Sequence, residues 1–164
     1  MSRRSQVSAG LLAFRRHNGL EVLLAHPGGP FWTKKDDGAW TIPKGVAETD
    51  LDPLSAARRE FTEETGFVAT GEVTPLQPVR QSSGKRVMAW AFEADYDLTE
   101  FSSNMFEMEW PPRSGRLKSF PEIDRLAWFS YDMSLKKIIT YQKSFLLELR
   151  AKIAPEGRET ARSD

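Results

Sequence analysis

The sequence predicts a single domain of mixed α and β structure. Its 164 residues are an ordinary length for one domain, and apolar residues make up 40% of them, enough for a substantial core. Segments with a strand pattern alternate unevenly with helical ones, and neither an internal repeat nor a linker interrupts them. We therefore expect one domain over residues 1–153 and a polar, disordered tail over residues 154–164.

The first quarter of the chain is expected to contain strands and one long loop. Residues 7–14 and 20–25 are apolar and are predicted to be strands, with a turn at residues 17–19 between them. Residues 26–38 are rich in Gly, Pro and charged residues, which indicates a loop. Residues 39–42 are expected to form a short strand after it.

A helix is predicted from Pro53 to Thr65. Asp52 is a favourable N-cap, Pro53 suits the first helical position, and Gly66 is a natural stop. An apolar stripe along this helix predicts that one side is buried while the acidic residues are exposed on another side. The stripe consists of Leu54, Ala57 and Phe61.

The second half of the sequence is expected to form further strands and a C-terminal helix. The strands are expected at residues 71–80, 86–94 and 126–129. Residues 134–153 have a helical pattern with a break near Thr140. Residues 95–121 contain two adjacent prolines and match neither pattern, so they are left unassigned.

Three glutamates on the predicted helix indicate a metal site. Glu60, Glu63 and Glu64 are spaced i, i+3 and i+4, which places them on one face, where they repel one another. A hard divalent cation such as Mg²⁺ takes such oxygen donors. Arg59 directly precedes Glu60 and lies four residues before Glu63, so its side chain can hold these carboxylates in place. Taken alone, the same spacing also fits a solvated acidic face.

Composition narrows the possible functions. The formal net charge is zero, which argues against a broad nucleic-acid-binding surface. The absence of cysteine excludes disulfides, thiolate metal sites and thiol nucleophiles. No segment has the length and hydropathy of a membrane span. We therefore expect a cytoplasmic protein that does not contact membranes.

The segment from Gly45 to Phe67 resembles the box of the MutT-like Nudix hydrolases. Gly45 stands at the first box position, and most of the second half matches as well: Arg59, Glu60, Phe61, Glu63, Glu64, Gly66 and Phe67. Leu51 departs from the box, since the family has its first Glu there. The preceding WTIPKG is also typical of the family. The segments HPGGPFW and FPEIDRLAWF are similar to a bacterial branch of predicted nucleoside triphosphate pyrophosphohydrolases.

This resemblance implies an α/β/α sandwich around a mixed sheet and hydrolysis of a nucleoside diphosphate linked to another group, with Mg²⁺ or Mn²⁺. Four residues would hold the metal: Glu60, Glu63, Glu64 and, through its carbonyl, Gly45. Arg59 would orient Glu60 or a neighbouring carboxylate, and Lys44 would lie near the phosphates. Leu51 replaces a partner of Arg59 rather than a metal ligand, so we expect activity to be retained.

The general base is expected to be a carboxylate. It is either one of the helix glutamates or, as the resemblance implies, a later residue. Glu122 is the first candidate because it lies six residues before Trp128 in a segment similar to the family's late Glu…Trp segment. Glu109 is the second candidate and Glu107 the third.

Substrate contacts are expected from two other segments. Phe31 and Trp32 either pack their loop onto the domain or stack on a nucleobase. Arg116 belongs to a small basic cluster that is either solvated or in contact with substrate phosphates. His26 ends a strand and is interpreted as structural rather than catalytic.

The expected partner is a nucleotide-type small molecule, and the protein is expected to be a monomer or a homodimer. Dinucleoside polyphosphates and nucleoside triphosphates are favoured over nucleotide sugars and ADP-ribose. The alternative is a nucleotide-binding or regulatory module that does not cleave its ligand, with Leu51 as its support in the sequence. The hydrolase would turn its substrate over, whereas the binding module would bind its ligand without turnover.

Overall fold

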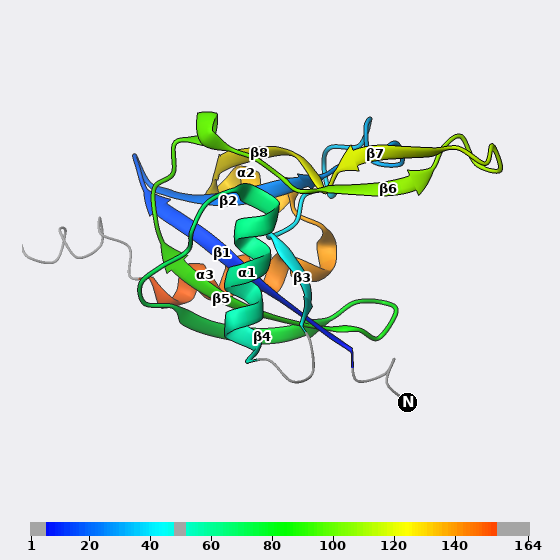
Figure 1. The fold of residues 1–164 in the computed structure, drawn as a ribbon. Helices are drawn as coiled ribbons and strands as arrows, with labels where there is room; N and C mark the ends of the chain where they lie inside the picture. The colour runs from blue at the N-terminus through cyan, green and yellow to red at the C-terminus, as the bar shows by residue number, and fades with distance from the viewer. Residues whose placement is uncertain (1–5, 48–51, 154–164) are drawn as a thin grey trace, which may run out of the picture.

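A computed structural model describes residues 6–47 and 52–153 and contains a six-stranded mixed sheet (Figure 1). The main path runs β4-β5-β1-β2-β8, and β3 pairs with β1 beside it. The strands of this sheet are β1 (Val7–Arg16), β2 (Leu20–Pro27), β3 (Lys44–Ala47), β4 (Thr74–Arg80), β5 (Arg86–Glu93) and β8 (Ile123–Ser130). Two further strands, β6 (Met105–Glu109) and β7 (Leu117–Pro121), form a separate hairpin.

Strand β1 is the centre of the sheet because it pairs with three others. It runs parallel to β5 along one edge, while its other edge pairs antiparallel with β3 at its beginning and with β2 at its end. Since β3 consists of Lys44–Ala47, this arrangement fixes Lys44 and Gly45 against the start of β1.

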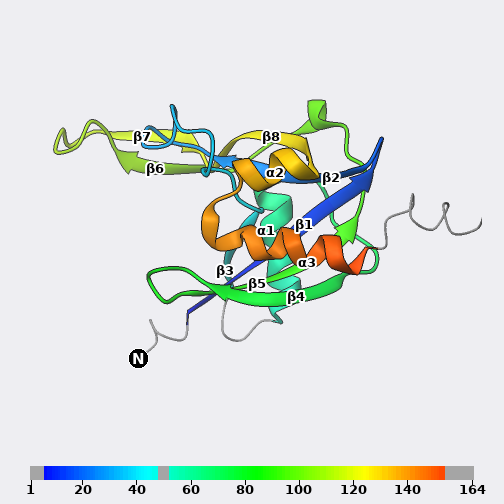
Figure 2. The ribbon, with the colours of Figure 1, turned by 180° about the vertical axis from the view of Figure 1, so that it is seen from behind.

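Helices cover both faces of the sheet, which confirms the predicted α/β/α sandwich (Figures 1 and 2). Helix α1 (Pro53–Thr65) packs on one face, and α2 (Tyr131–Lys137) and α3 (Lys143–Lys152) pack on the other. Side chains of β1 alternate between the two cores: Leu11 and Ala13 face α1, whereas Leu12 and Phe14 face the other layer. None of the described helices is both long and apolar enough to cross a membrane.

The bounds of α1 are those predicted. The Asp52 carboxylate accepts a hydrogen bond from the Ser55 amide (3.1 Å), and Gly66 ends the helix with a φ of 84°. A positive φ of this kind is easily reached only without a side chain. Ala57 and Phe61 are fully buried, as the apolar stripe predicts.

Several other predicted bounds need correction. The strand expected at residues 39–42 is absent: Trp40 and Thr41 form only isolated bridges, and the paired strand is β3. Strand β4 begins at Thr74 rather than at residue 71, and β8 extends further in both directions than residues 126–129.

The C-terminal helix is two helices. The expected break is confirmed, because a short 3-10 helix, η3 (Thr140–Gln142), separates α2 from α3. Helix α2 begins at Tyr131, where the Ser130 hydroxyl caps it by accepting from the Met133 amide (3.2 Å). The predicted disordered tail lies outside the described residues.

The unassigned segment contains a second 3-10 helix, η2 (Leu98–Glu100), and the β6–β7 hairpin. The hairpin extends away from the main sheet, on the side of the molecule where the loop after β2 lies (Figures 1 and 2). The end of β7 leads through Glu122 directly into β8. This connection brings a late part of the chain next to the first helix.

Candidate active site

Two of the three acidic residues of α1 lie against β3 rather than in open water. Glu64 is only 8% exposed and Glu60 is half-buried, whereas Glu63 is exposed. The prediction that all three are exposed is therefore wrong for Glu64 and Glu60. Helical spacing gives the face on which side chains lie, but not what covers that face.

Strand β3 contacts two of these carboxylates. The Lys44 amide donates to Glu64 Oε1 (3.3 Å). A Cβ placed on Gly45 would overlap the carboxyl group of Glu60, so glycine is required for Glu60 to lie against the strand. The strand and the helix together hold the carboxylates in a partly water-excluded site.

The Arg59 guanidinium bridges Glu60 and Glu63. Its Nη1 lies 3.2 Å from Glu60 Oε2 and 3.4 Å from Glu63 Oε2, so one guanidinium contacts both carboxylates. This arrangement reduces the repulsion between them. It also agrees with the orienting contact expected between Arg59 and Glu60.

Burial and repulsion from neighbouring carboxylates raise the pKa values of Glu64 and Glu60. The pKa of Glu64 is raised to about 8, chiefly by burial and then by the nearby charge of Glu60. Burial also raises the pKa of Glu60, with the charge of Glu63 as the next cause. The Lys44 ammonium beside Glu64 has its pKa lowered by burial, and the carboxylate opposes this shift.

Glu122 joins this cluster through a chain of backbone hydrogen bonds. The Asn104 amide donates to the Glu63 carbonyl, the Glu122 amide donates to the Asn104 carbonyl, and the Gly28 amide donates to the Glu122 carbonyl, each at 2.9 Å. Burial raises the pKa of Glu122, and the charge of Glu63 raises it further. The first candidate for the base thus lies within electrostatic range of the helix acids.

The other two candidates lie on the β6–β7 hairpin. Glu109 accepts a hydrogen bond from the Gly115 amide (2.6 Å), which ties it to the hairpin turn. Glu107 is exposed on β6. Neither contributes to the pKa shifts of the helix acids, in contrast to Glu122.

The donor set fits a hard divalent cation. Carboxylates with pKa values raised by burial and repulsion gain from a bound cation, which favours their ionised form. Over residues 6–47 and 52–153, no three Asp, Glu or His side chains are already arranged to hold a metal. Arg59 contacts the oxygens of Glu60 and Glu63 in this arrangement, so these side chains would have to turn toward the ion.

Two of the predicted substrate contacts, Phe31 and Trp32, lie in the loop between β2 and β3. Phe31 packs edge-to-face against Trp110 of the hairpin, with 5.4 Å between ring centroids. The Lys35 ammonium lies 5.3 Å from the ring centroid of Trp32. Arg116 lies in the exposed turn region of the hairpin and is not brought to the acidic residues.

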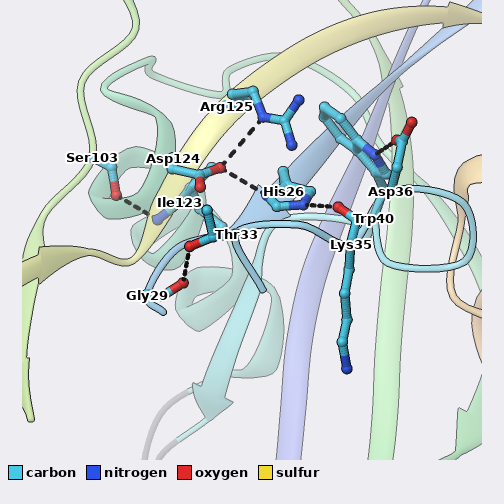
Figure 3. Close-up of polar contacts among 10 residues, drawn as sticks. All are labelled: His26, Gly29, Thr33, Lys35, Asp36, Trp40, Ser103, Ile123, Asp124 and Arg125. Atoms are coloured by element: carbon cyan, nitrogen blue, oxygen red, sulfur yellow. Dashed lines mark hydrogen bonds and ion pairs between the residues drawn. The ribbon is translucent and has the colours of Figure 1, made fainter. Parts of the chain in front are cut away.

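His26 fixes the base of this loop (Figure 3). It is fully buried, its Nδ1 lies 2.8 Å from Asp124 Oδ1, and its Nε2 lies 2.7 Å from the Lys35 carbonyl oxygen. The imidazole also packs edge-to-face on Trp40 at 5.2 Å. These contacts agree with the structural interpretation of His26.

Sequence reasoning missed Asp124. This residue is 98 positions from His26 and reaches it only because β2 and β8 pair antiparallel. Its place two residues after Glu122 was the available signal. Leu51, where the chain departs from the family box, lies outside the described residues.

Comparisons with known proteins identify the family and similar folds. The family model of the NUDIX domain matches residues 4–149. No curated protein matches the chain in sequence. Several solved structures have a similar fold, among them the following three.

The first is a binary complex of an Ap4A hydrolase from C. elegans, with a TM-score of 0.61 and 22% identity over 88% of this chain and 96% of that one. The second is the NUDIX domain of Shewanella oneidensis NrtR complexed with ADP ribose, with a TM-score of 0.59 and 17% identity over 87% and 83%. The third is a MutT protein from Methanosarcina mazei Go1, with a TM-score of 0.54 and 18% identity over 89% and 93%. At these identities the likeness is one of fold.

Proposed function

This chain belongs to the NUDIX family, and we propose that it hydrolyses a pyrophosphate bond in a nucleoside diphosphate linked to another group. The observation that carries the proposal is that Glu122, more than fifty residues later in the chain, lies within electrostatic range of the acidic residues of α1. Dinucleoside polyphosphates and nucleoside triphosphates are the favoured substrates. The Ap4A hydrolase among the similar structures is compatible with the first class.

The helix acids are proposed to hold Mg²⁺ or Mn²⁺. Glu60, Glu63 and Glu64 supply carboxylates, and Gly45 supplies its carbonyl. A bound divalent cation neutralises phosphate charge and lowers the pKa of an attached water. Arg59 keeps Glu60 and Glu63 from being pushed apart by their charges before the ion arrives.

Glu122 is the proposed general base. Its pKa is raised by burial and by Glu63, which brings its proton affinity closer to that useful near neutral pH. It would take a proton from the attacking water as the water's oxygen bonds to phosphorus and the bond from phosphorus to the leaving phosphate oxygen breaks. Glu122 lies between β7 and β8, on a different segment from the proposed ligands on α1 and β3, so it can face the ion without displacing one of them.

The substrate is proposed to lie along the strand-to-loop side of the site. Lys44 adjoins the buried Glu64 and supplies positive charge for the phosphates. Phe31 and Trp32 offer aromatic faces for a nucleobase, and Arg116 offers a guanidinium for a phosphate.

A product-release assay tests the proposal. The panel consists of diadenosine polyphosphates, canonical and oxidised nucleoside triphosphates, ADP-ribose and nucleotide sugars, each with Mg²⁺ and with Mn²⁺. We expect turnover that is lost with EDTA and falls at least a hundredfold in Glu63→Gln. Glu72→Gln, a change at an exposed acid beyond the helix, is the matched control and should behave as wild type.

The regulatory alternative predicts a different result. Leu51 favours it, since the first box Glu is missing. Saturable nucleotide binding by calorimetry without product release would overturn the hydrolase proposal and support a binding module. Turnover that depends on Glu63 would exclude that module.

A further inference from the structure

We propose that one face of the β6–β7 hairpin, together with Phe31, binds the distal nucleotide of a dinucleoside polyphosphate. This inference rests on the proposed function and names the substrate class for the same site. We define the hairpin platform by its residues: Phe31, Phe106, Met108, Trp110, Arg116, Lys118 and Phe120.

The strand register places these side chains together. Phe106 is opposite Phe120 and Met108 is opposite Lys118. Because side chains alternate along a strand, Trp110 lies on the same face as Met108, and Arg116 on the same face as Lys118. The Trp110 amide donates to the Arg116 carbonyl (2.9 Å), which continues the register by one more pair.

Phe31 lies against this face from the loop after β2. Its ring packs edge-to-face on Trp110, yet the residue remains 59% exposed. Gly29 lies against the ring of Phe106, where a Cβ would approach within 3.2 Å. The platform therefore combines rings held in place by contacts with an aromatic surface open to solvent.

The cations of the platform have no acidic partners of their own. In the described part of the chain, the side chains of Arg116 and Lys118 form no ion pair, and both residues are exposed. Stacking surfaces beside free cations match a nucleobase beside a phosphate. The opposite face of the hairpin differs, since Glu107 and Glu109 place negative charge there.

The platform is joined to the proposed catalytic residues. Lys118 is four residues before Glu122, about 13 Å along an extended strand. The Gly28 amide donates to the Glu122 carbonyl (2.9 Å), so the loop that carries Phe31 also begins at Glu122. His26 fixes the other end of that loop through the Lys35 carbonyl (Figure 3).

This geometry favours a ligand with two nucleosides. A phosphate chain bound at the helix acids would leave the platform to a second base and its phosphate. A nucleoside triphosphate carries one base and cannot occupy both ends. The platform thus predicts a preference for dinucleoside polyphosphates that the metal site alone cannot provide.

The test compares kcat/KM for diadenosine tetraphosphate with kcat/KM for ATP, both with Mg²⁺. We expect Trp110→Ala to lower the ratio of the two values at least tenfold, the scale of one lost stacking contact, and Lys118→Gln to lower it about threefold to tenfold. Leu117→Ala, an exposed apolar change on the opposite face, should leave the ratio as in wild type. An unchanged ratio in both platform variants would overturn the inference.

Failure of the proposed function would be seen separately. If the wild type hydrolyses neither compound, its binding of each compound with Mg²⁺ is measured by calorimetry. Binding of diadenosine tetraphosphate at least tenfold tighter than that of ATP, lost when Trp110→Ala is added, would support the platform without turnover. Equal affinities for the two compounds would overturn it.

Discussion

The carboxyl group of Glu60 occupies the space that a side chain on Gly45 would fill. Gly45 is in register with Ala9 of β1, so the strand cannot easily move away from the helix. This contact explains why the first position of the box is a glycine. It permits a helix carboxylate to lie directly on the strand backbone.

Gly45→Ala should therefore displace Glu60. The added methyl group meets the carboxyl group, which is the far end of a flexible side chain and can turn aside, so the unfolding free energy should fall by no more than about 1 kcal/mol. We expect kcat/KM to fall at least tenfold, because the displaced carboxylate would no longer face the ion. Urea unfolding and a product-release assay measure the two effects.

Val46→Ala is the control for this change, since it alters the neighbouring, exposed position of the same strand. Both quantities should remain close to wild type in Val46→Ala. Wild-type activity in Gly45→Ala would show that the position of Glu60 is not critical.

Glu122→Gln should lower kcat with little change in KM. The amide keeps the shape of the side chain but cannot accept the proton of the attacking water. We expect a drop of about a hundredfold or more in kcat, measured with the best substrate at saturating Mg²⁺. Glu109→Gln is the matched control, because Glu109 is bonded to Gly115 in the hairpin. The reverse outcome, with only Glu109→Gln inactive, would move the base to the hairpin.

Local signals explain what the sequence could predict. Asp52, Pro53 and Gly66 act within one turn of the helix ends, and the apolar stripe depends only on helical spacing, so α1 was predicted with its bounds. The metal-binding candidates follow from the same short segment. Their assignment needed no knowledge of the rest of the fold.

Long-range pairing explains what could not be predicted. Strand β3 has only four residues, and its partner in β1 lies more than thirty residues earlier, so no local pattern marks it. The hairpin strands are short and pair only with each other. The burial of Glu64 depends on β3 in turn, and was missed for that reason.

His26→Ala should loosen the loop that carries Phe31 and Trp32. The change removes the contacts to Asp124 and to the Lys35 carbonyl and leaves both oxygens without these partners. A loss of about 1–3 kcal/mol in unfolding free energy is expected. Since the helix acids are not touched, KM should rise more than kcat falls.

His17→Ala provides the comparison, because His17 lies in the exposed turn between β1 and β2. It should alter neither stability nor KM. A fall in kcat with an unchanged KM in His26→Ala would contradict the positioning of the loop by His26.

The raised pKa of Glu64 predicts how the unfolding free energy depends on pH in the absence of metal. This pKa in the folded protein is about 8, against an ordinary value of 4.5. Between these values the unfolded chain releases the proton while the folded protein keeps it, so the unfolding free energy falls as pH rises. The slope from this one group is at most about 1.4 kcal/mol per pH unit. The raised pKa values of Glu60 and Glu122 act in the same direction.

Urea unfolding between pH 5 and pH 8, roughly the window set by these pKa values, measures this slope with EDTA present. Glu64→Gln should flatten it because the amide does not titrate, whereas Glu72→Gln, at an exposed position, should leave it as in wild type. Saturating Mg²⁺ should also flatten it, since a cation held by the carboxylates keeps them ionised. A wild-type slope that neither Glu64→Gln nor Mg²⁺ changes would mean that the pH dependence arises elsewhere in the protein.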